Sequence, residues 1–360
     1  MVGDNTAMRF RLLFAMALSL VAMAAAPPSS WANGPWIGVR GNSLVNGSGD
    51  VIRLLGVNRS SAEYECVEGT QVFEGPTDQA SIRAMKGWYV NAVRLPLNES
   101  CWLGTAGVQP SLGGAAYREA IHAYVQRLER AGLYVILDLH WTAPDPYRAT
   151  GLIPLPDADH AADFWRSVAT EFRDDRSLLF DLYNEPHDVT WECWAAPCQV
   201  YDKWFGWYQA TGLPDLLAAV RSTGARQPVM LGGLDWASNL DGWLDHVPAD
   251  PANALVASNH TYDFTPCFRS CRAALARIAQ RFPVVTGELG EGDCRRRYVK
   301  LYMRWADRHG VSYLGWTWNT GGRWDCAGGP SLIRDYGGSP TRYGVGLRNH
   351  LRALFTVRRR

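Results

Sequence analysis

Short apolar runs alternate with amphipathic segments along the chain from about residue 36 onward. The runs are rich in Val, Ile and Leu and are nearly continuously apolar, which is typical of parallel strands covered on both faces. We predict strands at Val51–Val57, Ala92–Leu97, Tyr134–Trp141, Leu178–Glu185, Pro228–Gly232, Ala254–Tyr262, Pro283–Leu289 and Ser312–Asn319.

Between these strands, apolar residues recur with the period of a helix. Tyr117, Ile121, Val125 and Leu128 share one face of such a segment, and Gly132 marks its end. Further helices are predicted at Thr77–Gly87, Ala161–Arg173, Leu213–Thr223, Arg272–Phe282 and Thr341–Leu354, and around Val299, Tyr302, Met303 and Ala306.

The alternation of eight strands with helices predicts an α/β protein whose single domain is a (β/α)8 TIM barrel. A doubly wound open sheet is the alternative. That fold usually carries a Gly-rich phosphate turn after its first strand, and the segment Val57–Ser60 contains no glycine. The barrel is therefore the preferred fold.

The N-terminal segment has the pattern of a signal peptide. Arg9 and Arg11 precede the apolar run Leu12–Ala26, which is short for a membrane span. We expect residues 1–32 to be a signal peptide and residues 33–360 to be the catalytic barrel domain. An uncleaved anchor is the alternative. The predicted mature protein is secreted, monomeric and not bound to a membrane.

Composition narrows the class of partner. The formal net charge is +1, so the chain lacks the large positive charge that is typical of nucleic-acid-binding proteins. The chain holds 16 Trp and 15 Tyr, more aromatic residues than packing alone usually needs. Because sugar rings stack on indole faces, we expect a polysaccharide or oligosaccharide substrate.

The eight cysteines fit an exported protein with disulfide bonds. They form no C-x-x-C pair, and the chain has no H-E-x-x-H motif, so we expect no metal site and no cofactor. All eight follow predicted strand ends, where disulfides would brace the loops. The expected pairs are Cys66–Cys101 and Cys294–Cys326 between neighbouring loops, and Cys193–Cys198 and Cys267–Cys271 within one loop.

Polar residues stand at the ends of the otherwise apolar strands. From the second strand to the eighth they include Arg94, His140, Asn184, Glu185, His260, Tyr262, Glu288, Trp316 and Trp318. In a barrel the C-terminal strand ends converge on one mouth, where catalysis takes place. Asp138 and Asp181 come earlier on their strands, and we expect them to face deeper into the barrel.

Glu185 and Glu288 end the fourth and seventh strands, which face each other across the predicted mouth. Glycoside hydrolysis uses such a carboxyl pair, and a separation of about 5–5.5 Å allows one carboxylate to attack the sugar directly. Retention of anomeric configuration is therefore expected. An inverting reaction would need another base, for which Asp145 and Asp325 are the candidates.

The ordered set of strand-end residues resembles glycoside hydrolase family five, over the range Val51–Asn319. The stretch Tyr183–Pro186, which reads Tyr-Asn-Glu-Pro, is its most specific part. The resemblance implies that Glu185 is the acid/base and Glu288 the nucleophile. We expect Arg94 and Tyr262 to favour the charged form of Glu288, and the charge of Glu288 to raise the pKa of Glu185.

The same resemblance implies roles for the remaining residues. Asn184 would hydrogen-bond the 2-hydroxyl of the sugar being cleaved, and His140 and His260 would orient the sugar and the carboxylates. Trp318 would be the stacking platform under that sugar. Trp316 has the same strand parity and is the alternative platform.

The preferred function is a retaining endo-β-1,4-glucanase. A β-mannanase and an exo-acting β-glycosidase are alternatives within the family, and a transglycosylase would use the same residues. From a different class, the alternative is a non-catalytic carbohydrate-binding barrel. The long fourth loop, from His187 to about Gly212, leaves open whether the site is a cleft or a pocket.

Overall fold

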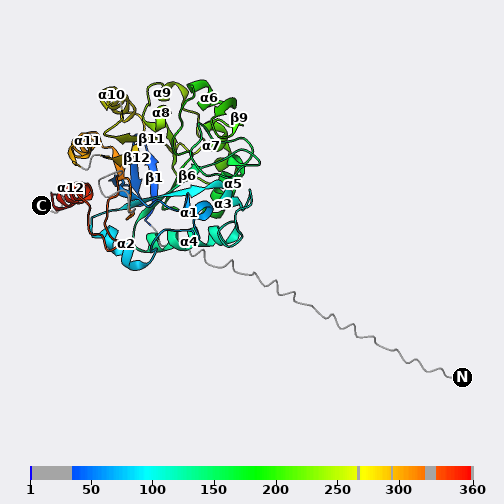
Figure 1. Cartoon of the computed structure of the whole chain (residues 1–360), viewed down its shortest axis with the longest axis horizontal. Helices are drawn as coiled ribbons and strands as arrows, with labels where there is room; N and C mark the ends of the chain where they lie inside the picture. Colours follow the sequence, from blue (N-terminus) through cyan, green and yellow to red (C-terminus); the bar gives the residue numbers. More distant parts are fainter. Residues whose placement is uncertain (2–34, 266–267, 293–294, 321–329, 358–360) are drawn as a thin grey trace. The chain divides into compact units, whose positions relative to one another are not determined.

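Eight parallel strands close into a barrel in consecutive order (Figure 1). The computed structural model describes residues 1, 35–265, 268–292, 295–320 and 330–357. The barrel strands are β4 (Leu55–Asn58), β5 (Ala92–Asn98), β6 (Tyr134–Trp141), β7 (Leu178–Asp181), β10 (Val229–Gly232), β11 (Leu255–Tyr262), β12 (Val284–Gly290) and β13 (Ser312–Gly315). Pairing of β13 with β4 completes the ring, so the predicted barrel is confirmed and the open sheet is excluded.

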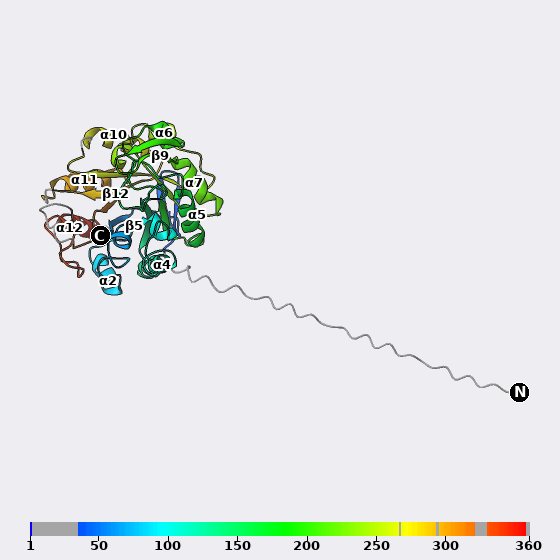
Figure 2. The ribbon, with the colours of Figure 1, turned by 45° about the vertical axis from the view of Figure 1, so that its right-hand side comes forward.

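Helices surround the barrel in both ribbon views (Figure 1, Figure 2). The long ones are α2 (Gln79–Lys86), α4 (Ala115–Arg130), α5 (Ala161–Glu171), α7 (Leu213–Ser222), α10 (Phe268–Ile278), α11 (Arg297–Arg308) and α12 (Gly344–Val357). Each overlaps a predicted helix. Between β10 and β11 the described chain forms only the short helices α8 (Leu234–Ala237) and α9 (Trp243–His246). None of the described helices is long and apolar enough to cross a membrane.

Alternate side chains on each barrel strand point inward, and the inward layer changes character along the barrel. At the N-terminal end it is an apolar cluster of Leu54, Ala92, Tyr134, Ile136, Leu179, Met230, Val256, Val285 and Leu314. Two residues beyond Ala92, Ile136 and Leu179, the same parity brings Arg94, Asp138 and Asp181 inward. The interior is therefore apolar at one end and polar at the end where the site lies.

The predicted strand Val51–Val57 is two strands in the structure. Its start, β3 (Val51–Ile52), joins β1 (Ile37–Arg40) and β2 (Ser43–Asn46) in an antiparallel sheet, while β4 belongs to the barrel. Ile37 and Leu44 of this small sheet pack against the apolar inward layer. The sheet therefore covers the N-terminal end of the barrel.

The loop after β7 contains structure that the sequence analysis missed. It forms the short helix α6 (Trp191–Ala195) and a hairpin of β8 (Cys198–Asp202) and β9 (Gly206–Ala210), which Figure 2 shows near α6. The disulfide Cys193–Cys198 joins α6 to the hairpin, as predicted. The alternation of polar and apolar residues in both strands is the sequence signal from which this hairpin could have been predicted.

A second predicted disulfide, Cys66–Cys101, joins α1 (Glu65–Glu68) to α3 (Glu99–Leu103) and so ties the first two mouth loops together. Cys271 is also disulfide-bonded. Its expected partner, Cys267, lies outside the described residues, as do Cys294 and Cys326. Apart from Met1, the predicted signal peptide lies outside them too.

Candidate active site

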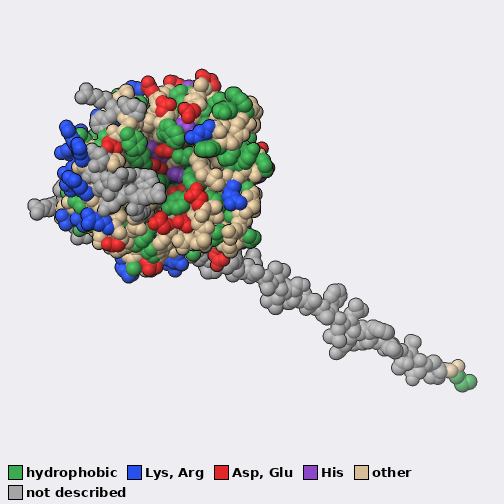
Figure 3. All heavy atoms as spheres, in the orientation of Figure 1, with side chains coloured by type: hydrophobic (Ala, Val, Ile, Leu, Met, Phe, Trp, Pro, Cys, Tyr) green, Lys and Arg blue, Asp and Glu red, His purple; other side chains and the backbone are tan. Residues whose placement is uncertain are grey.

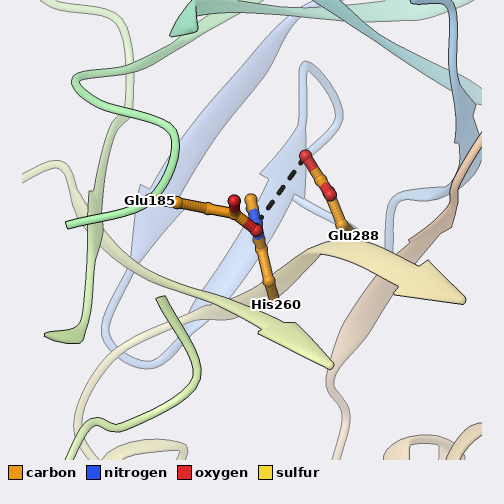
Figure 4. A group of neighbouring side chains, drawn as sticks. All are labelled: Glu185, His260 and Glu288. Carbon is orange, nitrogen blue, oxygen red and sulfur yellow. Dashed lines mark hydrogen bonds and ion pairs between the residues drawn. The ribbon is translucent and has the colours of Figure 1, made fainter. Parts of the chain in front are cut away.

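The polar strand-end residues meet at the C-terminal mouth of the barrel. Histidine and acidic side chains gather in a hollow near the centre of the face shown in Figure 3. Glu185 lies on the loop after β7, His260 on β11 and Glu288 on β12, and the three side chains point toward one another (Figure 4). Elements that are far apart in the sequence therefore supply one site.

The two candidate carboxylates face each other across His260 (Figure 4). The Nδ1 atom of His260 lies 2.8 Å from Oε1 of Glu185 and 3.7 Å from Oε1 of Glu288. One potential ligand atom from each of the three side chains lies within 4.8 Å of the other two. A separation this short matches the geometry in which one carboxylate attacks the sugar, because the arrangement with an intervening water needs about 6.5–9.5 Å.

Glu288 is held by two donors. Arg94 Nη1 donates to its Oε1 at 2.9 Å, and the Tyr262 hydroxyl donates to its Oε2. The carboxylate is 4% exposed, so water does little to stabilise its charge. The guanidinium and the hydroxyl instead bind one carboxylate oxygen each. Their contacts match the predicted placement of Arg94 and Tyr262.

Arg94 is fully buried, and its guanidinium binds four further side chains. It donates to Asp181 Oδ2 at 2.9 Å, Asn58 Oδ1 at 3.1 Å and Asn184 Oδ1 at 2.8 Å. It also pairs with Asp138 Oδ1 at 3.0 Å. Together with Glu288, the guanidinium therefore holds residues of β4, β6, β7 and β12 relative to one another.

We expected Asp138 and Asp181 only to face deeper into the barrel, and their role in binding Arg94 was not predicted. Burial raises the pKa of each carboxyl to about 7, although Arg94 acts in the opposite direction. Asn58 was missed as well. The available signal was strand parity, because Asp138 lies two residues before His140 and so points to the same side.

Burial is the main reason that the pKa of Glu185 is raised, to about 7. The charge of Asp138 raises it further, while His140 and Arg94 lower it. The predicted direction is thus confirmed, but its expected cause, the charge of Glu288, is replaced by desolvation. A carboxyl group with this pKa can hold a proton near neutral pH and act as a general acid.

Both histidines are neutral at ordinary pH because burial lowers their pKa, to about 4 for His140 and about 3 for His260. Nδ1 of His140 lies 2.7 Å from Asp138 Oδ2, which orients its ring. Neutral imidazoles offer one donor and one acceptor each. They can therefore position hydroxyl and carboxyl groups without adding charge.

Asn184 keeps a donor available at the mouth. Its Oδ1 accepts from Arg94, while its buried Nδ2 has no hydrogen-bond partner among the described residues. A buried unpaired amide is costly, about 1–3 kcal/mol, unless a ligand pairs with it. The amide can therefore donate to a hydroxyl group of a bound sugar.

The structure corrects the expected stacking platform. Trp318 is fully buried and packs edge-to-face against Trp88, with ring centroids 4.9 Å apart. A ring buried in this way offers no face to a sugar. Trp316 is only partly buried and lies parallel to the His140 ring, 5.6 Å away at an interplanar angle of 8°. Trp316, the alternative, is the platform candidate.

The candidates for an inverting base receive no support. Asp145 is 65% exposed and lies 2.7 Å from His160. Asp325 lies outside the described residues. Among the described residues, Glu185, His260 and Glu288 also form a donor set that suits a metal ion. A cation there would stand beside the positive charge of Arg94, which disfavours it.

Comparisons with known proteins find a matching family model and related sequences. The family model "Cellulase (glycosyl hydrolase family 5)" matches residues 47–322. Endoglucanase E-5 of Thermobifida fusca is 25% identical over 293 residues, which cover 78% of this chain and 54% of that protein. The chain thus spans about half the length of that relative. Mannan endo-1,4-beta-mannosidase of Streptomyces lividans is 24% identical over 297 residues, covering 79% of this chain and 67% of that protein.

Solved structures share the fold. Beta-glucanase SdGluc5_26A from Saccharophagus degradans, in complex with cellotetraose, has a TM-score of 0.68 at 18% identity and covers 89% of this chain and 94% of its own. The catalytic domain of the major endoglucanase from Xanthomonas campestris pv. campestris has a TM-score of 0.65 at 21% identity. It covers 88% of this chain and 99% of its own.

Proposed function

This chain belongs to the cellulase family, glycosyl hydrolase family 5, and we propose that it cleaves β-linked glucan with retention of anomeric configuration. One observation carries the proposal. An oxygen of Glu185 and an oxygen of Glu288 lie within 4.8 Å of each other at the barrel mouth. Carboxyl groups this close match the arrangement of retaining glycosidases, which supports a double displacement.

In the first step, an oxygen of Glu288 attacks the anomeric carbon and the glycosidic C–O bond breaks. Glu185, protonated near neutral pH because its pKa is about 7, gives its proton to the departing oxygen. The product is a covalent glycosyl ester on Glu288 and a free leaving group. Arg94 and Tyr262 stabilise the carboxylate of Glu288 before attack and after release.

In the second step, the ionised Glu185 takes a proton from water. The resulting oxygen attacks the anomeric carbon, and the ester bond to Glu288 breaks. Two inversions give net retention. Asn184 Nδ2 is placed to donate to the sugar, and this bond strengthens as positive charge develops on the ring. Trp316 supplies the flat face below it.

The proposed substrate is β-1,4-glucan, cleaved within the chain. Named endoglucanases from Thermobifida fusca and Robillarda sp. support this choice. Mannan is the second candidate, because two relatives are named mannan endo-1,4-beta-mannosidase. We also propose secretion, since the disulfides Cys66–Cys101 and Cys193–Cys198 are stable in an oxidising compartment.

A panel of carboxymethyl cellulose, mixed-linkage glucan and galactomannan tests the substrate, with reducing ends and product length as readouts. Long first products from glucan would support an endoglucanase. In parallel, Glu288→Gln should lower kcat by at least about 10⁴-fold while the protein stays folded. If the variant keeps near-normal activity on the best substrate, Glu288 is not the nucleophile.

A further inference from the structure

Positive charge is concentrated near the C-terminal end of the sequence, although the whole chain is nearly neutral. Residues 263–360 hold half of the 36 Lys and Arg but only 7 of the 35 Asp and Glu. In Figure 3 many Lys and Arg side chains gather along the left edge of the molecule, where Figure 1 shows α11 and α12. The net charge of +1 therefore conceals a strongly basic side of the barrel.

The outer face of α11 carries four exposed cationic side chains, which we call the cationic row: Arg297, Lys300, Arg304 and Arg308. They follow one another at intervals of three, four and four residues. Because an α-helix turns once in 3.6 residues, these intervals place all four side chains on one face, along about 16 Å of helix. The neighbouring helix α12 packs beside α11 and adds the exposed Arg352.

The cationic row is not neutralised by the protein itself. Within the part of the chain that the structure describes, no carboxylate forms an ion pair with any of its four side chains. Asp307 is the acidic residue of α11, and its two oxygens contact Arg53 and His350, each at 2.8 Å. The carboxylate of α11 is thus already bound by other groups, and the row keeps its positive charge.

Helix stability does not account for the cationic row. Arg297 and Lys300 lie in the first turn of α11, where the helix dipole disfavours positive charge. Arg304 follows Lys300 by four residues, and like charges at this spacing repel each other. The row is therefore unfavourable for the helix by itself, and an anionic partner would offset this repulsion.

The cationic row begins at the mouth end of the barrel. Glu291, the residue directly after β12, accepts hydrogen bonds from the backbone N–H groups of Arg297 at 2.8 Å and Val299 at 3.2 Å. These bonds fix the start of α11 to the C-terminal end of the strand that carries Glu288. From there the row runs along the outside of the barrel, away from the carboxyl pair.

The chemistry of the row suits a hydrophilic, linear polyanion. Three of its four members are Arg, whose planar guanidinium can bind a carboxylate through two parallel hydrogen bonds. The Debye length is about 8 Å at physiological ionic strength, so acidic residues on other sides of the barrel hardly weaken the attraction at the row. Leu301 is the exposed large apolar side chain of α11, whereas helices that lie in a membrane surface present a broad apolar face.

From these observations we propose that the cationic row binds an acidic polysaccharide, a linear polymer with carboxylate groups on its sugar units. The choice of a polysaccharide rests on the proposed function, because the mouth at the start of the row is proposed to bind one. The surface itself is separate from the carboxyl pair and takes no part in bond cleavage. It would hold the enzyme on material in which acidic and neutral polysaccharides lie together.

Retardation in native gels that contain polygalacturonate, at low and high salt, tests the proposal. The wild type should be retarded, and added NaCl should weaken the binding because the contacts are ionic. The double variant Lys300→Glu, Arg304→Glu should bind at least about tenfold more weakly, since two of the four charges of the row are reversed. Its kcat/KM on cellopentaose, a neutral substrate, should equal that of the wild type.

The matched control is the double variant Arg130→Glu, Arg226→Glu. Both residues are exposed and lie outside the row, at the end of α4 and in the loop before β10. The change in net charge is the same, so this variant should bind polygalacturonate as the wild type does. An equal loss in both double variants would overturn the assignment of the row.

Two further results would contradict the proposal. Absence of retardation of the wild type at low salt would show that the row is not a binding surface for this polymer. Equally strong binding to duplex DNA or to phosphatidylserine vesicles would overturn the choice of an acidic polysaccharide. Failure of the wild type to cleave cellopentaose, mixed-linkage glucan or galactomannan would instead count against the proposed function, because the binding measurement does not depend on catalysis.

Discussion

Glu185 and Glu288 approach each other so closely that an oxygen of one lies within 4.8 Å of an oxygen of the other. His260 stands between them and contacts both. The two residues are about 100 positions apart in the sequence, and their backbones lie on opposite sides of the barrel mouth. The spacing has a direct stereochemical consequence.

The first product should keep the β configuration of the cleaved bond. Carboxyl groups this close match the arrangement of retaining enzymes, in which the second carboxylate attacks the sugar directly. Proton NMR recorded in the first minutes, before mutarotation, distinguishes the anomers. A first-formed α-anomer would remove Glu288 as the nucleophile and would require a base from another loop.

The loss of activity at alkaline pH, the alkaline limb of the pH profile, should follow the deprotonation of Glu185. Its pKa is raised to about 7, and the acid acts only when protonated, so kcat/KM on glucan should fall as pH rises through about 7. Glu185→Ala should lower kcat/KM on glucan by about 10²–10⁴-fold and abolish this limb. The loss should be much smaller on an activated aryl-glycoside, whose leaving group needs no proton. An unchanged limb in Glu185→Ala would assign it to another group.

The two described disulfides should stabilise the fold to different extents. Cys66–Cys101 closes a separation of 35 residues and Cys193–Cys198 one of 5. By loop-closure entropy, replacing both cysteines with Ala should cost about 4 kcal/mol for the first pair and about 2 kcal/mol for the second. Urea unfolding of the two double variants measures the difference. Equal losses would argue against chain entropy as the main cause.

Trp316 and Trp318 should give opposite phenotypes although they are two residues apart. Trp316→Ala should lower kcat/KM by at least about tenfold with little change in unfolding free energy, because a partly exposed platform is lost. Trp318→Ala should destabilise the protein by about 3–5 kcal/mol, because a fully buried ring leaves a cavity. Steady-state kinetics and urea unfolding of both variants decide the assignment. The reverse pattern would restore Trp318 as the platform.

Much of the fold could be read from the sequence because parallel strands buried on both faces leave continuous apolar runs. The eight barrel strands each overlap a predicted run, as β6 (Tyr134–Trp141) does over its whole length. Glu185 and Glu288 stood out because ionisable groups are costly at the ends of such runs. Cys66 and Cys101 follow neighbouring strands of the barrel, so the order of the strands was enough to predict that they form a disulfide.

Only the tertiary structure decided which neighbouring polar or aromatic residue reaches the site. Strand parity could not separate Trp316 from Trp318, because β13 ends at Gly315 and alternation stops where the strand stops. The contacts of Arg94 with Asp138 and Asp181 join three strands, and the raised pKa of Glu185 comes from burial by the assembled barrel. The hairpin of β8 and β9 is joined to the distant loop after β6, where the Tyr208 hydroxyl donates to the Leu155 carbonyl at 2.7 Å. Such contacts depend on distances between segments, which sequence spacing does not encode.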